Sequence, residues 1–218
     1  MNDAKQRILA EVRRGLGRDT PPAPDQVESA RRDAYASSPA QHPVWDGDRV
    51  ERFLSRFDAE AGTWQRVSGM EAVADTVARH LAAGSLGTQL RVAPHPLLSD
   101  LAWPRTLEIT IGAEKGPDSN VAVSVAEMGL AETGTLVLYS GPESPTTLAF
   151  LPEFHIVVLR TGDVVDYMED VWRRMRERGD FPPRSLNFIT GPSRTADVEQ
   201  TIQLGAHGPR ALHLILVD

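Results

Sequence analysis

The stretch that decides the fold is the C-terminal part of the chain, which reads LNFITGPSRTADVE from Leu186 to Glu199 and LGAHGPRALHLILVD from Leu204 to Asp218. Apolar and β-branched residues open the first segment and fill the second from Ala211 onward, so each segment contains a predicted strand. Between the strands we expect a polar turn, a short helix and a histidine bracketed by glycines. This order predicts an open α/β sheet with polar residues at its ligand-binding edge.

The chain before this stretch alternates predicted strands with predicted helices. Apolar residues recur at helical spacing in three segments, 50–57, 70–81 and 164–175, with Ser68 as the expected N-cap of the second. Strands are predicted at 63–67, 89–93, 107–112, 121–126, 134–139 and 155–160. The link between 121–126 and 134–139 is shorter than the roughly ten residues of a crossover helix, so these strands should be antiparallel or offset neighbours. The sequence therefore predicts a three-layer α/β domain with a mixed, mostly parallel sheet.

The first part of the chain has a different composition. Apolar residues at 8, 9, 12 and 16 form one side of a short amphipathic helix that should end near Gly15 to Gly17. Five prolines follow between Asp19 and Pro43 with almost no apolar periodicity, which is typical of an extended arm. We therefore divide the chain into a helix and proline-rich arm, residues 1–44, and an α/β domain, residues 45–218.

Composition excludes several classes of function. The net charge of -7 argues against a nucleic-acid-binding surface, which needs a clustered excess of Lys and Arg. The chain has no cysteine, so it has no disulfide, no thiol nucleophile and no cysteine-ligated iron–sulfur cluster. No window approaches the roughly 18 apolar residues of a membrane span, and we expect a cytoplasmic protein. The six histidines show no metal-ligand spacing, so no metal site is predicted and no cofactor is identified.

The segment from Thr190 to Asp197 follows one predicted strand and precedes the predicted short helix. Hydroxyls and backbone N–H groups at a helix start can hold an anion. The segment is not a P-loop, because Pro192 lacks an N–H and Asp197 repels a phosphate. In a second interpretation, Ser193 or Thr195 only caps the helix and Asp197 complements its dipole. The residues themselves do not separate these interpretations.

Two further residues have chemical potential. His207 can donate to a substrate carboxylate or move a proton near neutral pH, or it can bond to the backbone of its own turn. Glu132 stands directly before Thr133 and Gly134 at a predicted strand start. Its carboxylate can act as a base, a nucleophile or a hydrogen-bond acceptor, or it can simply close the turn. Asp197 and Glu132 are a possible carboxylate pair across a cleft.

Four motifs, taken in order, resemble the LUD-domain family in its lactate utilization protein C branch. They are AETGT at 131–135, LPxxH at 151–155, TGPSxTADVE at 190–199 and GAHGP at 205–209. The resemblance covers residues 50–218 and implies a fold similar to the NagB/RpiA/CoA-transferase superfamily. It also implies a role in oxidising L-lactate to pyruvate beside iron–sulfur partner proteins, which would carry the clusters that this cysteine-free chain cannot bind.

The expected site combines the motif residues. Glu132 and His207 are the candidate catalytic residues, and a small carboxylate or an organic cofactor would contact Thr133, Gly134, Thr190, Gly191, Ser193, Thr195, Asp197 and Gly208. Two alternatives remain. One is a free-standing CoA-transferase-like or sugar-phosphate enzyme that uses Glu132, and the other is a non-catalytic assembly module that uses residues 1–44.

Overall fold

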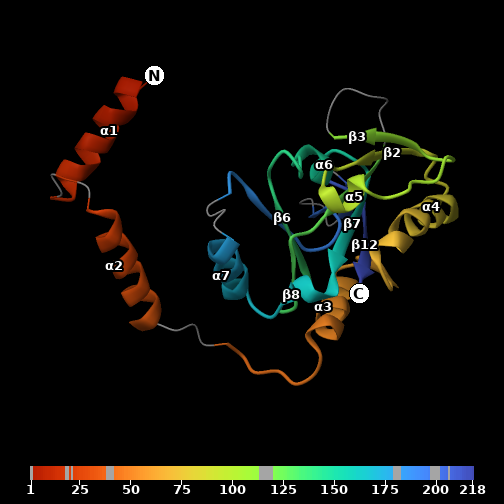
Figure 1. Cartoon of the computed structure of the whole chain (residues 1–218), viewed down its shortest axis with the longest axis horizontal. Helices are drawn as coiled ribbons and strands as arrows, with labels where there is room; N and C mark the ends of the chain where they lie inside the picture. The colour runs from red at the N-terminus through yellow and green to blue at the C-terminus, as the bar shows by residue number, and fades with distance from the viewer. Residues whose placement is uncertain are drawn as a thin grey trace. The chain divides into compact units, whose positions relative to one another are not determined.

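The computed structural model describes residues 2–17, 20, 22–37, 42–112, 120–178, 183–196, 202–205 and 207–218. It divides into one unit at Met1–Pro43 and another at Val44–Asp218. The first unit holds two helices, α1 (Asn2–Gly15) and α2 (Pro24–Ser37) (Figure 1). The expectation of an extended arm is therefore wrong for residues 24–37. Pro24 occupies the first helical turn, where its missing N–H costs nothing, and no proline follows until Pro39.

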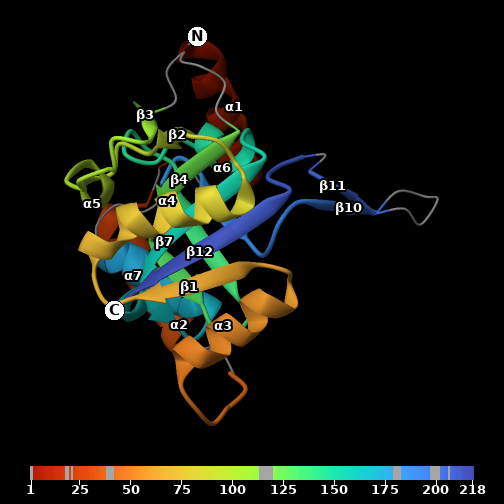
Figure 2. The ribbon, with the colours of Figure 1, turned by 90° about the vertical axis from the view of Figure 1, so that its right-hand side faces the viewer.

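The main sheet of the second unit has six parallel strands in the order β1-β12-β7-β4-β2-β3 (Figure 2). The C-terminal strand, β12, lies between β1 and β7. It pairs Leu212 with His155 of β7 and His213 with Thr63 of β1. Both faces are covered, so β4 and β12 are almost continuously apolar. The strands are β1 (Thr63–Val67), β2 (Gln89–Val92), β3 (Glu108–Ile111), β4 (Val121–Val125), β7 (Phe154–Arg160) and β12 (Ala211–Val217).

A second, mixed sheet has the order β8-β5-β6-β9. Its strands are β5 (Met128–Leu130), β6 (Thr135–Tyr139), β8 (Val164–Val165) and β9 (Leu186–Ile189). The predicted α/β class is confirmed, but the predicted pairing of 121–126 with 134–139 is wrong, because the two strands lie in different sheets. The backbone N–H of Ala126 donates to Val158 in β7, and the next N–H, of Glu127, donates to Val137 in β6. The chain thus leaves one sheet and joins the other within one residue.

The predicted helix after Thr190 is also wrong. Instead, β10 (Arg194–Ala196) pairs with β11 (Ile202–Leu204) in an antiparallel ladder that projects beyond the start of β12 (Figure 2). The Ser193 N–H donates to the Pro209 carbonyl and the Ser193 carbonyl accepts from the Gly205 N–H, so both groups are used outside a helix. Thr195 in β10 and Ile202 in β11 are β-branched, which also favours strands.

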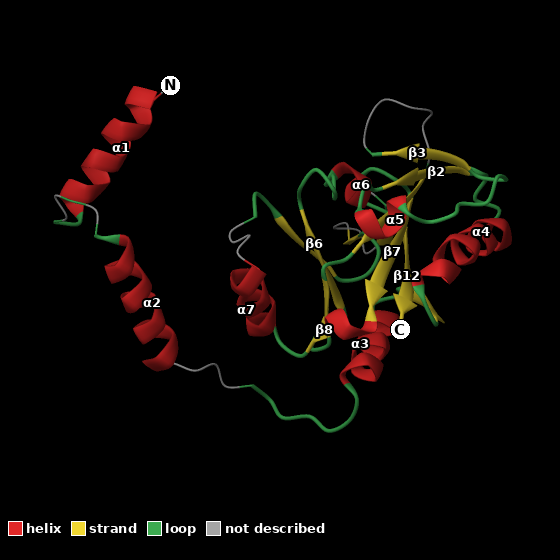
Figure 3. Cartoon of the chain, viewed as in Figure 1, coloured by secondary structure: helices red, strands yellow, loops and turns green. Residues whose placement is uncertain are grey.

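The described part of the second unit contains five α-helices, drawn in red in Figure 3. They are α3 (Arg49–Ala59), α4 (Val73–Gly84), α5 (Pro96–Ser99), α6 (Thr147–Phe150) and α7 (Met168–Arg178). Asp48 caps α3 by accepting from the N–H groups of Val50 and Glu51. Ser68 does not cap α4 as predicted, because a 3-10 turn at Met70–Ala72 precedes that helix.

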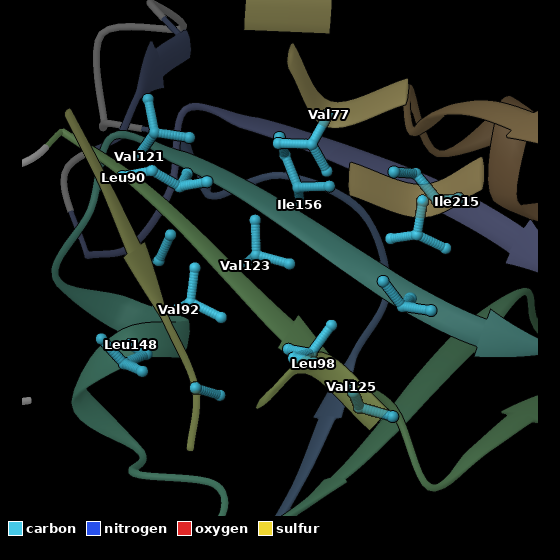
Figure 4. Close-up of a cluster of buried hydrophobic side chains, with 14 of the residues drawn as sticks. Val77, Leu90, Val92, Leu98, Val121, Val123, Val125, Leu148, Ile156 and Ile215 are labelled. Carbon is cyan, nitrogen blue, oxygen red and sulfur yellow. The ribbon is translucent and has the colours of Figure 1, made fainter. Parts of the chain in front are cut away.

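Apolar side chains fill both faces of the main sheet. On one face, α4 and α5 cover a cluster that includes Val77, Leu98, Val123 and Ile156 (Figure 4). On the other face, α3 places Phe53 and Phe57 against the alternate residues of β7 and β12. A third cluster joins the second sheet to α7. These packed layers hold the amino and carboxyl ends of the parallel strands in place. The polar side chains of the candidate sites lie at those ends.

Candidate functional site

Three threonines connect two of the sequence motifs. The hydroxyl of Thr135 lies 2.6 Å from that of Thr133 and 2.6 Å from that of Thr190. The contact follows from the register of the second sheet, in which Leu136 pairs with Ile189 and so places Thr135 beside Thr190. Thr135 is buried, whereas Thr133 and Thr190 are exposed. The predicted proximity of the AETGT and TGPS segments is therefore present in the structure.

Two motif glycines let these segments pack against α3. Gly134 has φ +70°, and a Cβ atom there would lie 2.4 Å from the backbone nitrogen of Phe57. Gly191 has φ +85°, and a Cβ atom there would lie 2.4 Å from the carbonyl oxygen of Glu60. Positive φ and the lack of space both require glycine. In the described structure these predicted binding residues thus contact the protein's own helix.

Ser193 connects the TGPS segment to the GAHGP segment. Besides its backbone bonds to Pro209 and Gly205, its hydroxyl accepts from the His207 N–H at 3.4 Å. A Cβ atom at Gly208 would lie 3.4 Å from the Ser193 Cβ. The structure therefore brings Ser193, His207 and Gly208 together, as the motifs suggested.

A hollow of about 550 Å³ opens beside these residues, and we call it the His207 hollow. It is lined by the residues before β7 and by the residues before β12, namely Phe150, Leu151, Pro152, Glu153, Gly205, His207, Gly208 and Arg210. Its volume is within the range of about 300 to 1,000 Å³ found for small-molecule sites. Two motif segments form its wall, and Ser193 joins the third to them.

The charged groups of the His207 hollow are Arg210 and Glu153. Arg210 Nη1 lies 3.6 Å from Glu153 Oε2, and both side chains are more than half exposed, at 57% and 51%. An exposed pair at this distance contributes little stability, so the guanidinium is available to an anionic ligand. The guanidinium also lies 5.4 Å from the centroid of the Phe154 ring, which holds it near the hollow.

Glu132 lies elsewhere. Its N–H donates to the Asp166 carbonyl, and its carboxylate is near Tyr167, whose pKa it helps to raise after burial and Asp166. It does not line the His207 hollow. Thr195 lies in β10. Asp197 is outside the described residues, so its pairing with Glu132 stays a prediction. The predicted single cleft containing Glu132 and His207 is not seen among the described residues.

The His207 hollow lies at the amino ends of β7 and β12, whereas open α/β sheets usually bind ligands at the carboxyl ends of their strands. Fully buried His155 stands just inside this edge, with its Nε2 2.7 Å from the hydroxyl of Ser124. Burial lowers the pKa of His155 to about 4, so its imidazole is neutral at pH 7. His155 is therefore a buried structural partner of Ser124 rather than a solvent-accessible ligand.

The carboxyl edge carries a separate group of charged side chains. From β2 the chain moves outward to β3, whereas from β4 it moves the other way through β7 to β12, so the strand order reverses between β2 and β4. His95 follows β2 and Glu127 follows β4. Their side chains approach to 4.0 Å around a hollow of about 30 Å³. Such a reversal is where open α/β sheets commonly bind ligands.

Hydrogen bonds define the state of this group. His95 Nδ1 accepts from the Leu97 N–H, which assigns the proton of the neutral ring to Nε2, on the side of Glu127. Glu127 in turn accepts from Arg178 Nη1 at 2.6 Å. Asp163 contacts Arg160, Arg174 and Arg178 at 2.9, 3.5 and 3.9 Å. The small hollow and the mutual pairing indicate a charged network that holds α7 to the sheet edge.

Sequence reasoning missed both charged groups. Arg210 directly follows the GAHGP motif and Glu153 lies within the LPxxH motif, so closeness to a motif was the available signal. Glu127 directly follows one predicted strand and His95 comes two residues after another, which was a signal for the carboxyl edge. Among the described residues, no group of three or more His, Asp or Glu side chains is arranged to hold a metal ion. No described helix is long and apolar enough to cross a membrane.

Fold and motif positions together define the class of protein. The LUD domain matches residues 110–217. These residues contain β4, β7 and β12 of the main sheet and all four motifs. This matched region, just under half of the chain, carries the similarity to the LUD-domain family. A crystal structure of a DUF162 family protein from Deinococcus radiodurans has the same fold, with a TM-score of 0.61, 17% identity and coverage of 81% of this chain and 100% of that one.

The chain is also similar to proteins named lactate utilization protein C. It is 38% identical to that protein of Geobacillus thermodenitrificans, over 46% of this chain and 43% of the relative. It is 35% identical to that of Bacillus subtilis, over 48% and 45%, and 35% identical to the uncharacterized protein YkgG of Escherichia coli, over 49% of each. The match thus spans less than half the length of these curated relatives.

Proposed function

We propose that the chain is a cytoplasmic component of an L-lactate utilization system and that the His207 hollow binds the small carboxylate on which the system acts. One observation carries the proposal: three motif segments converge on one hollow that presents His207 and Arg210. The similarity to lactate utilization protein C supports the choice of ligand. This function requires no CoA-transferase chemistry at Glu132.

The chemistry of the hollow suits a hydroxy acid. A guanidinium can bind a carboxylate through two parallel N–H groups, and ligand binding at Arg210 would replace its long contact with Glu153. The imidazole of His207 is exposed and can exchange a proton with the ligand hydroxyl. Arg210 therefore orients the carboxylate, and His207 exchanges the proton of the hydroxyl on the neighbouring carbon.

Oxidation of L-lactate to pyruvate removes an electron pair together with the hydroxyl proton and the proton of the hydroxyl-bearing carbon. Without cysteine, this chain cannot bind a thiolate-ligated cluster to receive those electrons. In our proposal, iron–sulfur partner proteins accept the electrons while this chain holds the acid. The chain is then a component of a complex rather than a self-sufficient enzyme.

Calorimetric titration of the purified chain with L-lactate and with pyruvate tests the binding step. We expect His207→Gln and Arg210→Gln each to weaken binding about tenfold or more, which corresponds to roughly 1.4 kcal/mol. Arg105→Gln removes an exposed arginine outside the hollow and should leave the affinity unchanged. The absence of binding at millimolar acid, or equal losses in all three variants, would contradict the proposal.

A reconstitution tests the role in the system. Lactate-dependent reduction of the iron–sulfur partner proteins should be faster with this chain than without it, and Arg210→Gln should remove most of the gain. Equal rates with and without the chain would exclude a role in lactate oxidation, whatever the result of the titration.

An assembly role is a second candidate, and one observation favours it. Four apolar side chains of α1 and the turn directly after it are exposed, with exposed fractions of 63, 41, 51 and 62% for Ile8, Leu9, Val12 and Leu16. An amphipathic helix usually buries such a stripe against another surface. Here the partner would be an iron–sulfur protein of the same system. Deletion of residues 1–44 should then abolish co-purification with that protein. Co-purification that survives the deletion would exclude an assembly role for residues 1–44.

A further inference from the structure

A second hollow lies on the α4 side of the sheet, at the amino ends of β1 and β12. It has a volume of about 340 Å³, and we call it the His213 hollow. Its wall combines apolar side chains, among them Leu86 and Phe154, with the polar groups of Thr63, His80, Arg210 and His213. A mostly apolar hollow with a few converging polar groups is typical of a site for an organic ligand.

We propose that the His213 hollow binds the flat heteroaromatic ring of an organic ligand, and that Arg210 contacts an acidic group of the same ligand. This proposal does not depend on the binding of lactate in the His207 hollow. It assigns a different ligand class to a different set of side chains.

The two histidines provide a flat surface. The rings of His80 and His213 are stacked, with centroids 3.7 Å apart and planes inclined by 19°. His213 comes from β12 and His80 from α4, so the stack joins the sheet to the helix that covers it. His80 is only partly buried. The outer face of such a pair is a platform on which another planar ring can stack.

Both rings are uncharged at neutral pH. Burial lowers the pKa of His80, and burial followed by the charge of His80 lowers the pKa of His213 to about 4. A neutral imidazole does not repel an electron-poor or cationic ring, and it keeps one nitrogen as an acceptor and one as a donor. The platform therefore suits heteroaromatic rings more than anions, which need Arg210.

His213 also lacks one hydrogen-bond partner. Its Nδ1 lies 2.8 Å from the Thr63 hydroxyl, but its Nε2 is buried and has no partner among the described residues. The side chain is 7% exposed, so water does not easily replace that partner. Buried polar atoms are rarely left unpaired, and an unpaired one requires an explanation. A polar atom of a ring bound beside the stack, reached by a small shift of His80, would complete the set.

Arg210 connects the two hollows. It lines the His207 hollow on one side and the His213 hollow on the other, and Phe154 lies beneath its guanidinium. A ligand whose ring lies against His80 therefore has its acidic substituent within reach of Arg210. The chemical class that fits is a heteroaromatic acid or a nucleotide, not a short aliphatic acid.

The test uses the full chain and three probes, nicotinate, indole-3-acetate and AMP, with L-lactate as the ring-free comparison. Binding is followed through the ring resonances of His80 and His213 in NMR spectra. We expect at least one heteroaromatic probe to shift both resonances in a saturable way, and L-lactate to leave them in place. If no heteroaromatic probe shifts them at millimolar concentration, the proposal is wrong.

Variants separate this site from the His207 hollow. Ala211 lies on the same face of β12 as His213 and lines the hollow, so Ala211→Leu should fill it and weaken probe binding about tenfold or more. Ala102→Leu adds the same atoms at an exposed position and should have no effect. Probe binding that is unchanged in Ala211→Leu would overturn the proposal.

A second pair of variants guards against misfolding. His80→Phe keeps a flat ring and should retain probe binding, whereas His80→Leu removes the ring and should lose it. Equal affinities in these two variants would also overturn the proposal. L-lactate titrations of the same variants are independent. Failure of lactate binding with intact probe binding would contradict only the proposed lactate function.

Discussion

At the scale of single residues, the motif glycines act through backbone conformation. Gly134 and Gly191 lie at positive φ where β6 begins and where β9 ends, and each is pressed against the backbone of α3. The helix thus holds the two segments joined by the Thr135–Thr190 contact. A family motif that contains ETG and TGPS therefore has a structural reason in addition to any chemical one.

This reasoning predicts that Gly134→Ala is strongly destabilising. The new Cβ atom would lie 2.4 Å from the Phe57 nitrogen and 2.6 Å from the Arg56 carbonyl carbon, and backbone atoms cannot move aside easily. Together with positive φ, this contact should lower the free energy of unfolding by about 3 kcal/mol or more. Urea denaturation measures the loss.

The matched control is Gly141→Ala. Gly141 has no positive φ, and a Cβ atom there would meet nothing within 4 Å. We expect its free energy of unfolding to stay within about 0.5 kcal/mol of the parent. If both glycine variants unfold alike, α3 does not constrain the AETGT turn.

At the scale of elements, the Glu127–Arg178 pair fastens the last turn of α7 to the link between β4 and β5. Its atoms are 2.6 Å apart and the side chains are 23% and 36% exposed, so the pair is better shielded than a surface ion pair. We expect Glu127→Gln to lower the free energy of unfolding by about 1 to 2 kcal/mol and to speed amide exchange in α7.

Glu177→Gln is the control on the same helix. Glu177 lies 4.0 Å from Arg173, and both side chains are more than 60% exposed, at 65% and 62%. Such a pair contributes at most a few tenths of a kcal/mol, so the variant should resemble the parent in both measurements. Faster exchange in both variants would mean that helix charge, rather than the contact with the sheet edge, stabilises α7.

The elements also show what the sequence predicts well. Buried parallel strands such as β4, β7 and β12 were found because continuous apolar runs are required when both faces are covered. The short strand β5 was missed because three residues carry no periodicity. The β10–β11 ladder was missed because its strands have only three residues each, too few to show a periodicity. The same holds for the candidate sites. Residues in motifs were found from the sequence, whereas the roles of Arg210 and His95 follow from neighbours that only the fold brings to them.

At the scale of the whole molecule, the core belongs to one unit. The three apolar clusters all lie within Val44–Asp218, whereas the described apolar residues of α1 are exposed. We therefore expect residues 44–218 alone to unfold in one cooperative transition, with a free energy of unfolding within about 1 kcal/mol of the full chain. Urea denaturation of both chains measures this. A loss of several kcal/mol on truncation would show that the first unit contributes to the core.

The buried histidines give the molecule a predicted response to acid. The pKa of His155 falls from 6.5 to about 4 in the folded protein because of burial, and His213 shifts in the same direction. Between these values the unfolded chain binds protons that the folded chain does not, so acid favours unfolding. The free energy of unfolding should be flat above about pH 6.5 and fall as the pH drops toward 4. For His155 alone the full loss is roughly 3 kcal/mol.

Urea denaturation between about pH 6.5 and 5 measures the effect before most carboxylates titrate. His155→Gln should weaken the pH dependence in this range, whatever its effect on stability at pH 7, because the substituted side chain has no proton to bind. NMR titration of the ring signals locates each pKa independently. A parent protein whose stability is constant across this range would mean that water reaches both buried rings and that the core around β7 and β12 is more open than the structure shows.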